Sequence, residues 1–440
     1  MVIVFVLVAL AVLAAVVALH HYVWRRLVRD TTRAPGPARR AGTALFTAGP
    51  LLMVAALVAE RSGAPFWLQR ALAWPGFLWM ALALALALYL LLTTVAAEPV
   101  RWWAVRRRGR GSAESAAAVP VPVPETGKSS ASDSAADSAA EQPPAAPSPA
   151  TDTVVTVPPV TPQPPDFSRR LFVSRVAGGV VAGVAVGTVG WGTYGVLRGP
   201  RVKRVTVPLA KLPRAAHGYR IAVVSDIHLG PVLGRDFAQR VVDTVNSTQP
   251  DLIAVVGDLV DGSVKNLGPA AAPLAGLKAR HGAYFVTGNH EYFSGAAQWV
   301  AEVRTLGLHP LENARTEMPY FDLAGVNDLQ GESEGQGPDF ARALDDRDPA
   351  RACVLLAHQP VQIHEAVRHA VDLQLSGHTH GGQLWPGNLI AAAANPTVAG
   401  LERYGDTQLY VSRGAGAWGP PTRVDAPSDV TVIELAATSA

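Results

Sequence analysis

Asp, His and Asn residues gather at five places in the second half of the chain, each directly after a short apolar run. The five places read "VVSDIHLG", "VVGDLVDG", "VTGNHEYF", "LLAHQP" and "LSGHTHGG". Side chains alternate along an extended strand, so the two polar residues of D-x-H share one side, as do those of H-x-H. Imidazole, carboxylate and carboxamide groups together suit divalent metals such as Mn, Fe, Zn or Co. The residues that predict this metal chemistry are Asp226, His228, Asp258, Asn289, His290, His358, His378 and His380.

Short buried strands are needed to carry these side chains to a common place. The apolar runs before the clusters are partly β-branched, which is typical of buried strands. Residues 235–248 and 296–307 lie between the runs and predict helices. Alternating strands and helices predict an α/β sheet whose functional groups collect at the carboxyl ends of the strands. Residues 319–328, 407–416 and 429–437 predict antiparallel strands of a second sheet packed on the first.

The five clusters resemble, in order, the motifs of the calcineurin-like metallophosphoesterases: D-x-H, G-D, G-N-H-[DE], H and G-H-x-H. The resemblance runs from residue 219 to near the C-terminus, and no motif residue departs from the pattern. It implies an α/β fold in which a two-sheet β-sandwich is flanked by helices. The run "GHTHGGQLWPG" is similar to the membrane-associated branch of the family, which includes phosphodiesterases that act on lipid-like substrates.

The resemblance also implies a dinuclear metal site. The implied ligands are Asp226, His228 and His380 for the first ion, Asn289, His358 and His378 for the second, and Asp258 for both. Two ions about 3.5–4 Å apart lower the pKa of a bridging water, so that a metal-bridged hydroxide is available near neutral pH. That hydroxide would attack phosphorus in line with the leaving oxygen.

Polar residues beside the motifs have two interpretations each. His290 follows the candidate ligand Asn289 and is expected to assist catalysis, as a general acid or by stabilising the phosphoryl oxygens. The alternative is that His290 only holds the site together. Asp261 and Glu291 either orient ligands through hydrogen bonds or are solvated turn residues, and we expect Glu291 to be a turn residue.

Large apolar residues beside the last candidate ligands predict a substrate contact. Trp385 is the candidate substrate-binding residue, and Leu389 and Ile390 follow it. Exposed apolar patches often contact a membrane or a ligand. The alternative is that residues 388–394 begin an ordinary buried helix. Other aromatic residues that either line a substrate groove or join the core are Tyr292, Phe293 and Trp418.

The composition indicates a membrane protein or a domain with membrane segments attached. Of 440 residues, 49% are hydrophobic and 17% are charged. The net charge of +3 is small and the arginines cluster beside apolar segments, so no nucleic-acid partner is expected. Cys353 is the one cysteine of the sequence, so no intrachain disulfide can form, and a small core residue of a strand is expected there.

Four apolar stretches reach the length of about 20 residues that a helix needs to cross a bilayer. They cover approximately residues 2–18, 41–59, 77–96 and 176–197. The first could be a signal peptide, but no basic region precedes it and no small-residue cleavage site follows. The second carries Pro50, which weakens its assignment.

Arginine placement predicts the orientation of the spans. Arginines are dense after the first and third spans, so these segments are expected in the cytoplasm, with the last domain outside it. The basic run "RGPRVKR" after the fourth span disagrees with this orientation. The run "SRRLFVSR" before that span resembles a twin-arginine export signal, and a basic cytoplasmic flank is the alternative.

These features divide the chain into four predicted parts. Pro, Ala and Ser dominate the second part, which cannot bury enough apolar surface to offset its ordering entropy. The parts are a three-span transmembrane region at 1–110, a disordered linker at 111–167, a fourth span with a twin-arginine-like start at 168–200, and a catalytic domain at 201–440.

The favoured function is a membrane-anchored, dinuclear-metal-dependent phosphoesterase of the cell membrane. A phosphodiester is the favoured substrate, with a lipid-linked form expected. The alternative is a membrane sensor or scaffold that uses the hydrolase fold to bind a phosphorylated ligand. A transporter is disfavoured because the spans lack the ionisable residues that mark transport paths. The sequence does not separate monoester from diester preference, and it does not indicate the oligomeric state.

Overall fold

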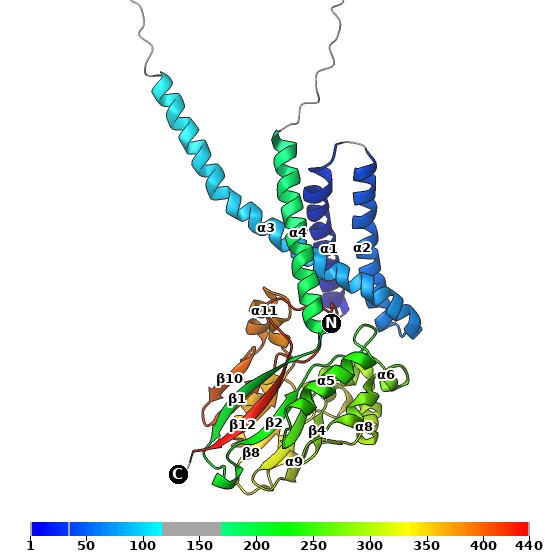
Figure 1. Cartoon of the computed structure of the whole chain (residues 1–440), viewed down its shortest axis with the longest axis vertical. Helices are drawn as coiled ribbons and strands as arrows, with labels where there is room; N and C mark the ends of the chain where they lie inside the picture. The colour runs from blue at the N-terminus through cyan, green and yellow to red at the C-terminus, as the bar shows by residue number, and fades with distance from the viewer. Residues whose placement is uncertain (1, 34–35, 117–168, 439–440) are drawn as a thin grey trace, which may run out of the picture. The chain divides into compact units, whose positions relative to one another are not determined.

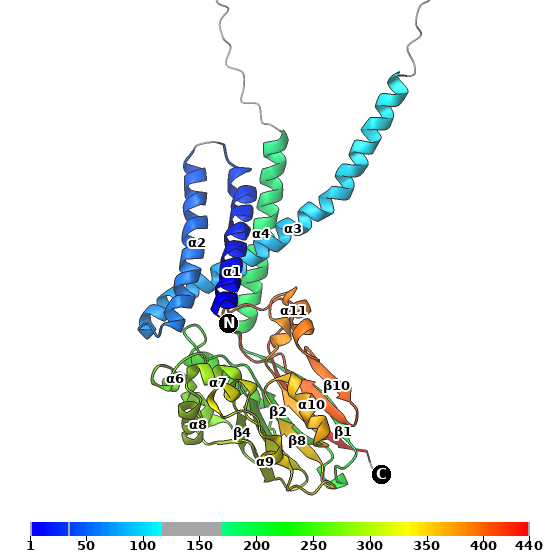
Figure 2. The same cartoon turned by 180° about the vertical axis from the view of Figure 1, so that it is seen from behind.

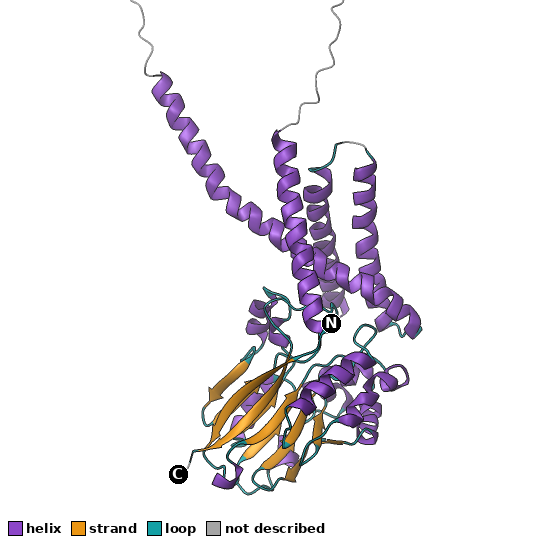
Figure 3. Ribbon diagram, viewed as in Figure 1, coloured by secondary structure: helices purple, strands orange, loops and turns teal. Residues whose placement is uncertain are grey.

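A computed structural model describes residues 2–33, 36–116 and 169–438 (Figure 1). Residues 1–90 and 173–440 form one compact unit, and residues 91–172 form another. The first unit contains both long helices and a domain of strands and shorter helices, which Figure 3 separates by colour.

The first sheet of the domain runs in the order β1-β12-β2-β3-β4-β5. Strands β2 to β5 are parallel, whereas β12 is antiparallel to β2 and parallel to β1. Each strand from β2 to β4 is largely buried, as the apolar runs of the sequence predicted. The strands are β1 (Arg201–Leu209), β2 (Tyr219–Val224), β3 (Leu252–Val256), β4 (Ala283–Val286), β5 (Leu308–Pro310) and β12 (Asp429–Ala437).

The second sheet runs in the order β10-β11-β9-β8-β7-β6. Its central strands β7, β8, β9 and β11 are parallel, and only the edge strands β6 and β10 are antiparallel to their neighbours. The prediction that residues 319–328, 407–416 and 429–437 form antiparallel strands of a second sheet is only partly right. Each of these strands also has a parallel neighbour, and residues 429–437 form β12 of the first sheet. The strands are β6 (Ala314–Glu317), β7 (Asp322–Gly325), β8 (Cys353–Leu356), β9 (Leu373–Ser376), β10 (Gly400–Tyr404) and β11 (Thr407–Val411).

Helices cover the outer face of each sheet (Figures 1 and 2). The first sheet is covered by α5 (Arg235–Ser247), α6 (Val264–Ala271) and α8 (Ala296–Thr305), and the second by α9 (Phe340–Leu344) and α10 (Ile363–Arg368). Two further helices lie in loops, α7 (Asn289–Ser294) and α11 (Gly387–Ala394). Short 3-10 turns occupy Arg214–Ala216, Ala272–Gly276, Leu329–Glu334, Pro360–Gln362 and His380–Gly382.

Three apolar clusters hold these layers together. One lies between the first sheet and its helices, where Phe237, Val241 and Val245 of α5 recur at helical spacing and are buried. The second lies between the two sheets, and the third between the second sheet and its helices, where Cys353 is fully buried as predicted. Each fully buried large apolar side chain contributes about 1.5–3 kcal/mol. The expected two-sheet sandwich flanked by helices is confirmed.

The long helices confirm four candidate membrane spans. The helices are α1 (Val2–Trp24), which continues as a π-helical turn (Arg25–Arg29), α2 (Pro37–Arg61), α3 (Phe66–Ala116) and α4 (Arg169–Leu197). The segments apolar enough to cross a membrane are Leu10–Arg29, Pro37–Arg61, Phe66–Ala96 and Leu171–Leu197. Pro50 lies inside the continuous helix α2. Helix α3 includes residues 111–116, which the sequence assigned to the linker, and residues 117–168 of that linker lie outside the described residues.

Contacts join the long helices to the domain within the first unit. Phe66 of α3 packs against the cluster over the first sheet, and Val232 of the domain packs against Phe77 and its neighbours. Thr193 of α4 lies 2.7 Å, hydroxyl to hydroxyl, from Thr422. The domain is therefore attached to the helices through side chains as well as through the chain itself.

Candidate metal centre

All eight residues singled out from the sequence lie where strands of the two sheets end. Asp226 and His228 follow β2, Asp258 follows β3, and the pair Asn289–His290 begins α7 after β4. His358 follows β8, and His378 and His380 follow β9. The polar ends therefore come from both sheets, whereas the sequence predicted the edge of a single α/β sheet. Close packing of the sheets brings the two sets of ends together.

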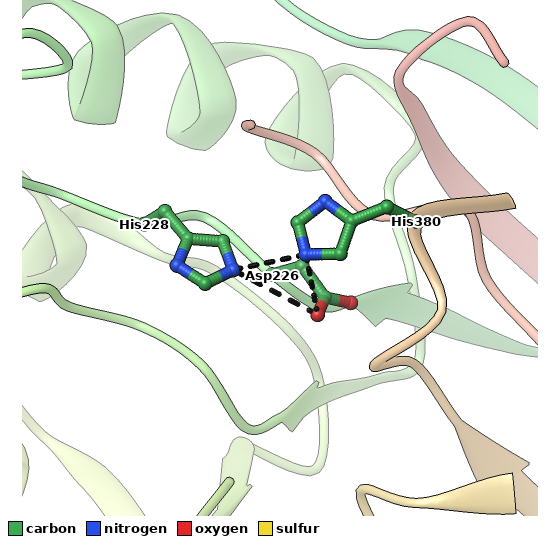
Figure 4. A group of neighbouring side chains, drawn as sticks. All are labelled: Asp226, His228 and His380. Atoms are coloured by element: carbon green, nitrogen blue, oxygen red, sulfur yellow. Dashed lines mark hydrogen bonds and ion pairs between the residues drawn. The ribbon is translucent and has the colours of Figure 1, made fainter. Parts of the chain in front are cut away.

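One group joins Asp226, His228 and His380 (Figure 4). The two Nε2 atoms of His228 and His380 are 3.0 Å apart. The Oδ1 of Asp226 lies 3.3 Å from Nε2 of His380 and 4.0 Å from Nε2 of His228. All three side chains are buried. Three ligand atoms that face one another at these distances would bind a cation between them.

A second group joins Asp258, His358 and His378. The Nε2 of His358 lies 3.1 Å from Oδ2 of Asp258, yet it makes no hydrogen bond and is buried. Asn289 Oδ1 lies 3.0 Å from Nδ1 of His378. Asp258 Oδ2 is also 3.8 Å from Nε2 of His228, so this carboxylate lies between the two groups. That position fits the bridging role that the family resemblance implied for Asp258.

Hydrogen bonds at the far side of two imidazole rings leave Nε2 free to bind a metal. Nδ1 of His358 donates to the carbonyl of Val256 at 2.8 Å, and Nδ1 of His228 lies 2.9 Å from Asp261 Oδ1. A neutral ring that donates through Nδ1 keeps its lone pair on Nε2. Burial opposes protonation of His358, but Asp258 outweighs it and raises the pKa of this ring, so a bound metal would displace a proton from Nε2. The buried Nε2 of His358 without a hydrogen bond and the oxygen–nitrogen donor set both fit a divalent cation.

The backbone at the candidate ligands is strained. Left-handed backbone is unusual for residues with a Cβ, and such strain gathers at functional sites. Two glycines permit the close packing around them: a Cβ on Gly257 would lie 2.6 Å from Nδ1 of His358, and one on Gly377 would collide with Ser225 and Asp226. The candidate ligands with positive φ are Asp226 (51°), His228 (49°), Asp258 (51°), His378 (72°) and His380 (53°).

Burial and mutual charge set the protonation of the candidate ligands. Burial disfavours the charged forms of Asp226 and Asp258, but the adjoining histidines outweigh it and hold both pKa values well below the usual range. Burial lowers the pKa of His378 and of His380 to about 4, so both rings are neutral at pH 7. A neutral imidazole is the form that binds a metal.

His290 lies at the rim of the centre and is bonded to Asp261. Nδ1 of His290 is 2.6 Å from Oδ1 of Asp261, the oxygen that also accepts from His228. Burial opposes protonation, but the hydrogen bond to Asp261 outweighs it and raises the pKa of His290 to about 9. His290 can also be grouped with His228 and Asp258 as a three-residue cation site. Asp261 engages Nδ1 of both His228 and His290, so it links this rim residue to a candidate ligand.

The expectation that Glu291 is a solvated turn residue is wrong. The side chain is fully buried, and its carboxylate accepts backbone N–H bonds from Asp258 at 3.0 Å, Leu259 at 2.8 Å and Gly288 at 2.6 Å. Burial raises the pKa of Glu291 to about 7. Glu291 therefore joins the loop that carries Asp258 to the loop that carries Asn289, a role that the third position of helix α7 makes available.

Arg423 is a buried part of the centre that sequence reasoning missed. Its Nη1 donates to the carbonyl of His380 at 2.9 Å, and its Nη2 lies 3.2 Å from Nδ1 of the same residue. It also donates to the carbonyls of Gly416 and Arg413, both at 2.7 Å. Arg423 belongs to no motif and lies far from His380 along the chain, so no local signal indicated it.

Two exposed aromatic rings flank His290. The ring centroids of Phe293 and Trp418 lie 5.5 and 5.7 Å from that of His290, and all three residues line one cavity of about 560 Å³. Trp385 instead lines a separate cavity of about 230 Å³, so its substrate-binding role stays a prediction. Residues 387–394 form helix α11, which has no buried residue, so the alternative of a buried helix there is wrong. Tyr292 is buried.

Several known proteins with similar sequences are described as metallophosphoesterases. Residues 219–382 match the sequence profile of the calcineurin-like phosphoesterases. A "Transmembrane protein with metallophosphoesterase domain" of Danio rerio is 38% identical over 260 residues, which cover 56% of this chain and 59% of that protein. An "Uncharacterized metallophosphoesterase" of Helicobacter pylori is 37% identical over 247 residues, with 56% and 66% covered. The chain thus spans about three fifths of the length of these two relatives.

A further relative is covered almost completely. The "Uncharacterized metallophosphoesterase" of Aquifex aeolicus is 36% identical over 240 residues, which cover 53% of this chain and 91% of that protein. The similarity therefore extends over a whole protein as well as over the residues of the motifs.

Proposed function

Because this chain belongs to the calcineurin-like metallophosphoesterases, a family whose members are hydrolases, we propose that it hydrolyses phosphodiesters at a membrane with two divalent metal ions. The convergence of seven candidate ligands, with Asp258 between two groups of ligand atoms, carries this proposal. The first ion is assigned to Asp226, His228 and His380, and the second to Asn289, His358 and His378, with Asp258 shared. When bound, the ions would activate a water molecule and neutralise charge on the phosphoryl oxygens.

The reaction adds water across one P–O bond, giving a phosphomonoester and an alcohol. The departing oxygen needs a proton, and His290 lines the cavity beside the ligands. Since Asp261 engages Nδ1 of His290, Nε2 is the atom that can carry a proton to the leaving oxygen. Phe293 and Trp418 flank this ring, limit the access of water and contact the leaving group.

The test is hydrolysis by the purified full chain in detergent micelles. Bis-p-nitrophenyl phosphate and p-nitrophenyl phosphate are offered with Mn²⁺, Fe²⁺, Zn²⁺ or Co²⁺ in turn, beside a sample stripped with a chelator. We expect turnover that disappears on chelation and returns with metal, and that is faster on the diester. Faster turnover of the monoester would replace the diester proposal by a phosphatase.

The same experiment distinguishes the enzyme from the sensor alternative. A sensor that uses this fold would bind a phosphorylated ligand and turn over neither chromogen in any metal. Metal binding without hydrolysis of either ester would therefore overturn the enzyme proposal. The complete set of motif residues favours turnover.

The domain is proposed to lie outside the cytoplasm, attached to the cell membrane by several spans. The arginine-rich segments after the first and third spans favour this orientation. The start of α3 and the end of α4 both contact the domain, which agrees with four crossings. A reporter that is active only outside the cytoplasm should be active when fused after residue 205 and silent when fused near residue 140. The reverse result would place the domain in the cytoplasm.

A further inference from the structure

The cavity beside His290 has one wall that the catalytic domain does not supply. Leu57, Glu60 and Arg61 at the end of α2 line it, together with Phe77 and Met80 of α3. The opposite side is formed by residues of the site loops: Asp261, Gly262, His290, Phe293, Ser294, Trp418, Gly419 and Pro420. We call the five residues of α2 and α3 the helix wall. Two segments that are apolar enough to span a membrane thus border the reaction site.

Packing holds the helix wall against the site loops. Phe77 is buried with Ala56 and Ala73, and Val232 of the domain packs on this cluster. The Cε of Met80 approaches Gly419 so closely that a Cβ there would lie 3.5 Å away. The guanidinium of Arg61 lies 6.0 Å from the ring centroid of Phe293, which is within the range of a cation–π contact.

The helix wall is apolar except at its end nearest the polar loops. Leu57 and Met80 offer hydrocarbon surface, whereas Glu60 offers a carboxylate and Arg61, which lies against Phe293, a guanidinium. Among the described residues the Glu60 side chain has no hydrogen-bond partner, although Asp261 across the cavity is engaged by both His228 and His290. A carboxylate repels the anionic phosphoryl group of a substrate and attracts a cation or a hydrogen-bond donor. Glu60 therefore suits a substrate that brings its own positive charge or hydrogen-bond donor.

We propose that the helix wall is the specificity site of this enzyme for membrane phosphodiesters whose headgroup carries an ammonium or hydroxyl donor. The proposal rests on the phosphodiesterase function proposed above. Hydrocarbon chains of the substrate lie along Leu57 and Met80, and the headgroup donor binds Glu60. The phosphorus then lies on the side of the cavity where His290 is found.

Three phospholipids with the same acyl chains separate the possible headgroup chemistries. The full-length protein in mixed micelles receives phosphatidylethanolamine, phosphatidylglycerol or phosphatidylmethanol at equal surface fractions, and kcat/KM is measured for each. Phosphatidylmethanol has no donor on its headgroup. We expect phosphatidylethanolamine or phosphatidylglycerol to have a higher kcat/KM than phosphatidylmethanol. A preference for phosphatidylethanolamine would indicate an ammonium donor, and a preference for phosphatidylglycerol would indicate hydroxyl donors.

Two substitutions of Glu60 test its part in the selection. A hydrogen bond to a charged group is worth about 1.5–3 kcal/mol. Glu60→Gln should therefore lower the ratio of kcat/KM on the preferred lipid to kcat/KM on phosphatidylmethanol by at least about tenfold. Glu60→Asp, which keeps the carboxylate, should restore part of it. Bound metal, measured by elemental analysis, shows that the variants keep the centre intact. An unchanged ratio in Glu60→Gln, with metal bound, would overturn the assignment of Glu60.

The apolar part of the helix wall has a matched control on the same helix. Leu57 lines the cavity, whereas the neighbouring Val58 is exposed and does not. Leu57→Ala should lower kcat/KM on the preferred lipid several-fold, and Val58→Ala should leave it unchanged. Equal losses in both variants would mean that α2 acts only as an anchor. An enzyme that hydrolyses bis-p-nitrophenyl phosphate but none of the three lipids would overturn this proposal and leave the phosphoesterase function standing. A metal-loaded enzyme that hydrolyses neither bis-p-nitrophenyl phosphate nor any of the three lipids would overturn the proposed phosphodiesterase function itself.

Discussion

The candidate ligands and the cavity beside them are built in opposite ways. Five of the seven candidate ligands are buried, five lie on strained backbone, and further buried groups such as Glu291 and Arg423 hold them. The cavity has rims that are half exposed, with Phe293 at 57% and Trp418 at 51%, and its other wall comes from α2 and α3. The first region is determined by the packing of two sheets, and the second by loops and helices packed against them.

This difference separates the chemistry from the choice of substrate. Strain of about 1–3 kcal/mol per residue persists only where the surrounding structure enforces it, so the ligand positions tolerate little change. Exposed aromatic and aliphatic side chains at the rim are held by fewer contacts and can be exchanged at a smaller cost. Substitutions of the candidate ligands should therefore have large effects on bound metal and turnover. Substitutions at the rim of the cavity should have smaller effects, on kinetic constants alone.

The largest effect is expected from the carboxylate shared by the two ligand groups. Asp258→Ala should abolish turnover and release metal, because Asp258 lies within reach of both groups. Elemental analysis and diester hydrolysis are measured on the same preparation. Asp406→Ala, in the exposed turn between β10 and β11, is the control and should match the wild type. Full metal content in Asp258→Ala would contradict the shared position.

A smaller effect, confined to the rate, is expected at His290. His290→Gln should lower kcat by about 10²- to 10⁴-fold, the usual contribution of a positioned acid or base. Bound metal should stay at the wild-type level, since Asp261 rather than a metal holds this ring. Loss of metal from His290→Gln would instead show that His290 is a metal ligand and belongs with the buried residues of the centre.

Asp261 joins the two regions, and its replacement should have an intermediate outcome. Its Oδ1 contacts Nδ1 of both His228 and His290, so Asp261→Asn weakens the orientation of one candidate ligand and of the rim residue together. The expected loss is about 10- to 100-fold in metal affinity or activity. Metal titration beside steady-state kinetics measures it. Wild-type behaviour in both would mean that the rings are oriented by packing alone.

The smallest effect should come from the exposed aromatic rim. Trp418→Ala should raise KM for a chromogenic diester by about 2- to 13-fold, the equivalent of 0.5–1.5 kcal/mol for an aromatic contact. Trp385→Ala is the matched comparison, because Trp385 has a similar exposure of 42% but lines another cavity. A larger rise of KM in Trp385→Ala than in Trp418→Ala would show that the substrate contacts Trp385, as the sequence predicted.

The sequence was most informative where function depends on neighbours in the chain. The apolar runs that precede the five polar clusters placed every candidate ligand at a strand end, and the structure brings these ends together. The sequence was least informative where tertiary packing decides. Arg423 reaches His380 from a distant loop, Glu291 is buried by the approach of two loops, and Glu60 enters the cavity from a membrane helix. Only the bond from Gly288 to Glu291 follows a local spacing, that of a helix cap, and the other contacts join residues that no spacing or periodicity connects.

The pairing of β1 with β12 bears on the order in which the protein is assembled during its synthesis. Arg201 pairs with Asp429 and Leu209 with Ala437, and β12 lies between β1 and β2. A contact between strands so far apart in the chain forms late, because the intervening loop must first be closed. The first sheet is therefore incomplete until residues 429–437 have left the ribosome. Since Asp226 follows β2, which pairs with β12, the candidate metal centre is completed only after the four long helices among the described residues have been synthesised.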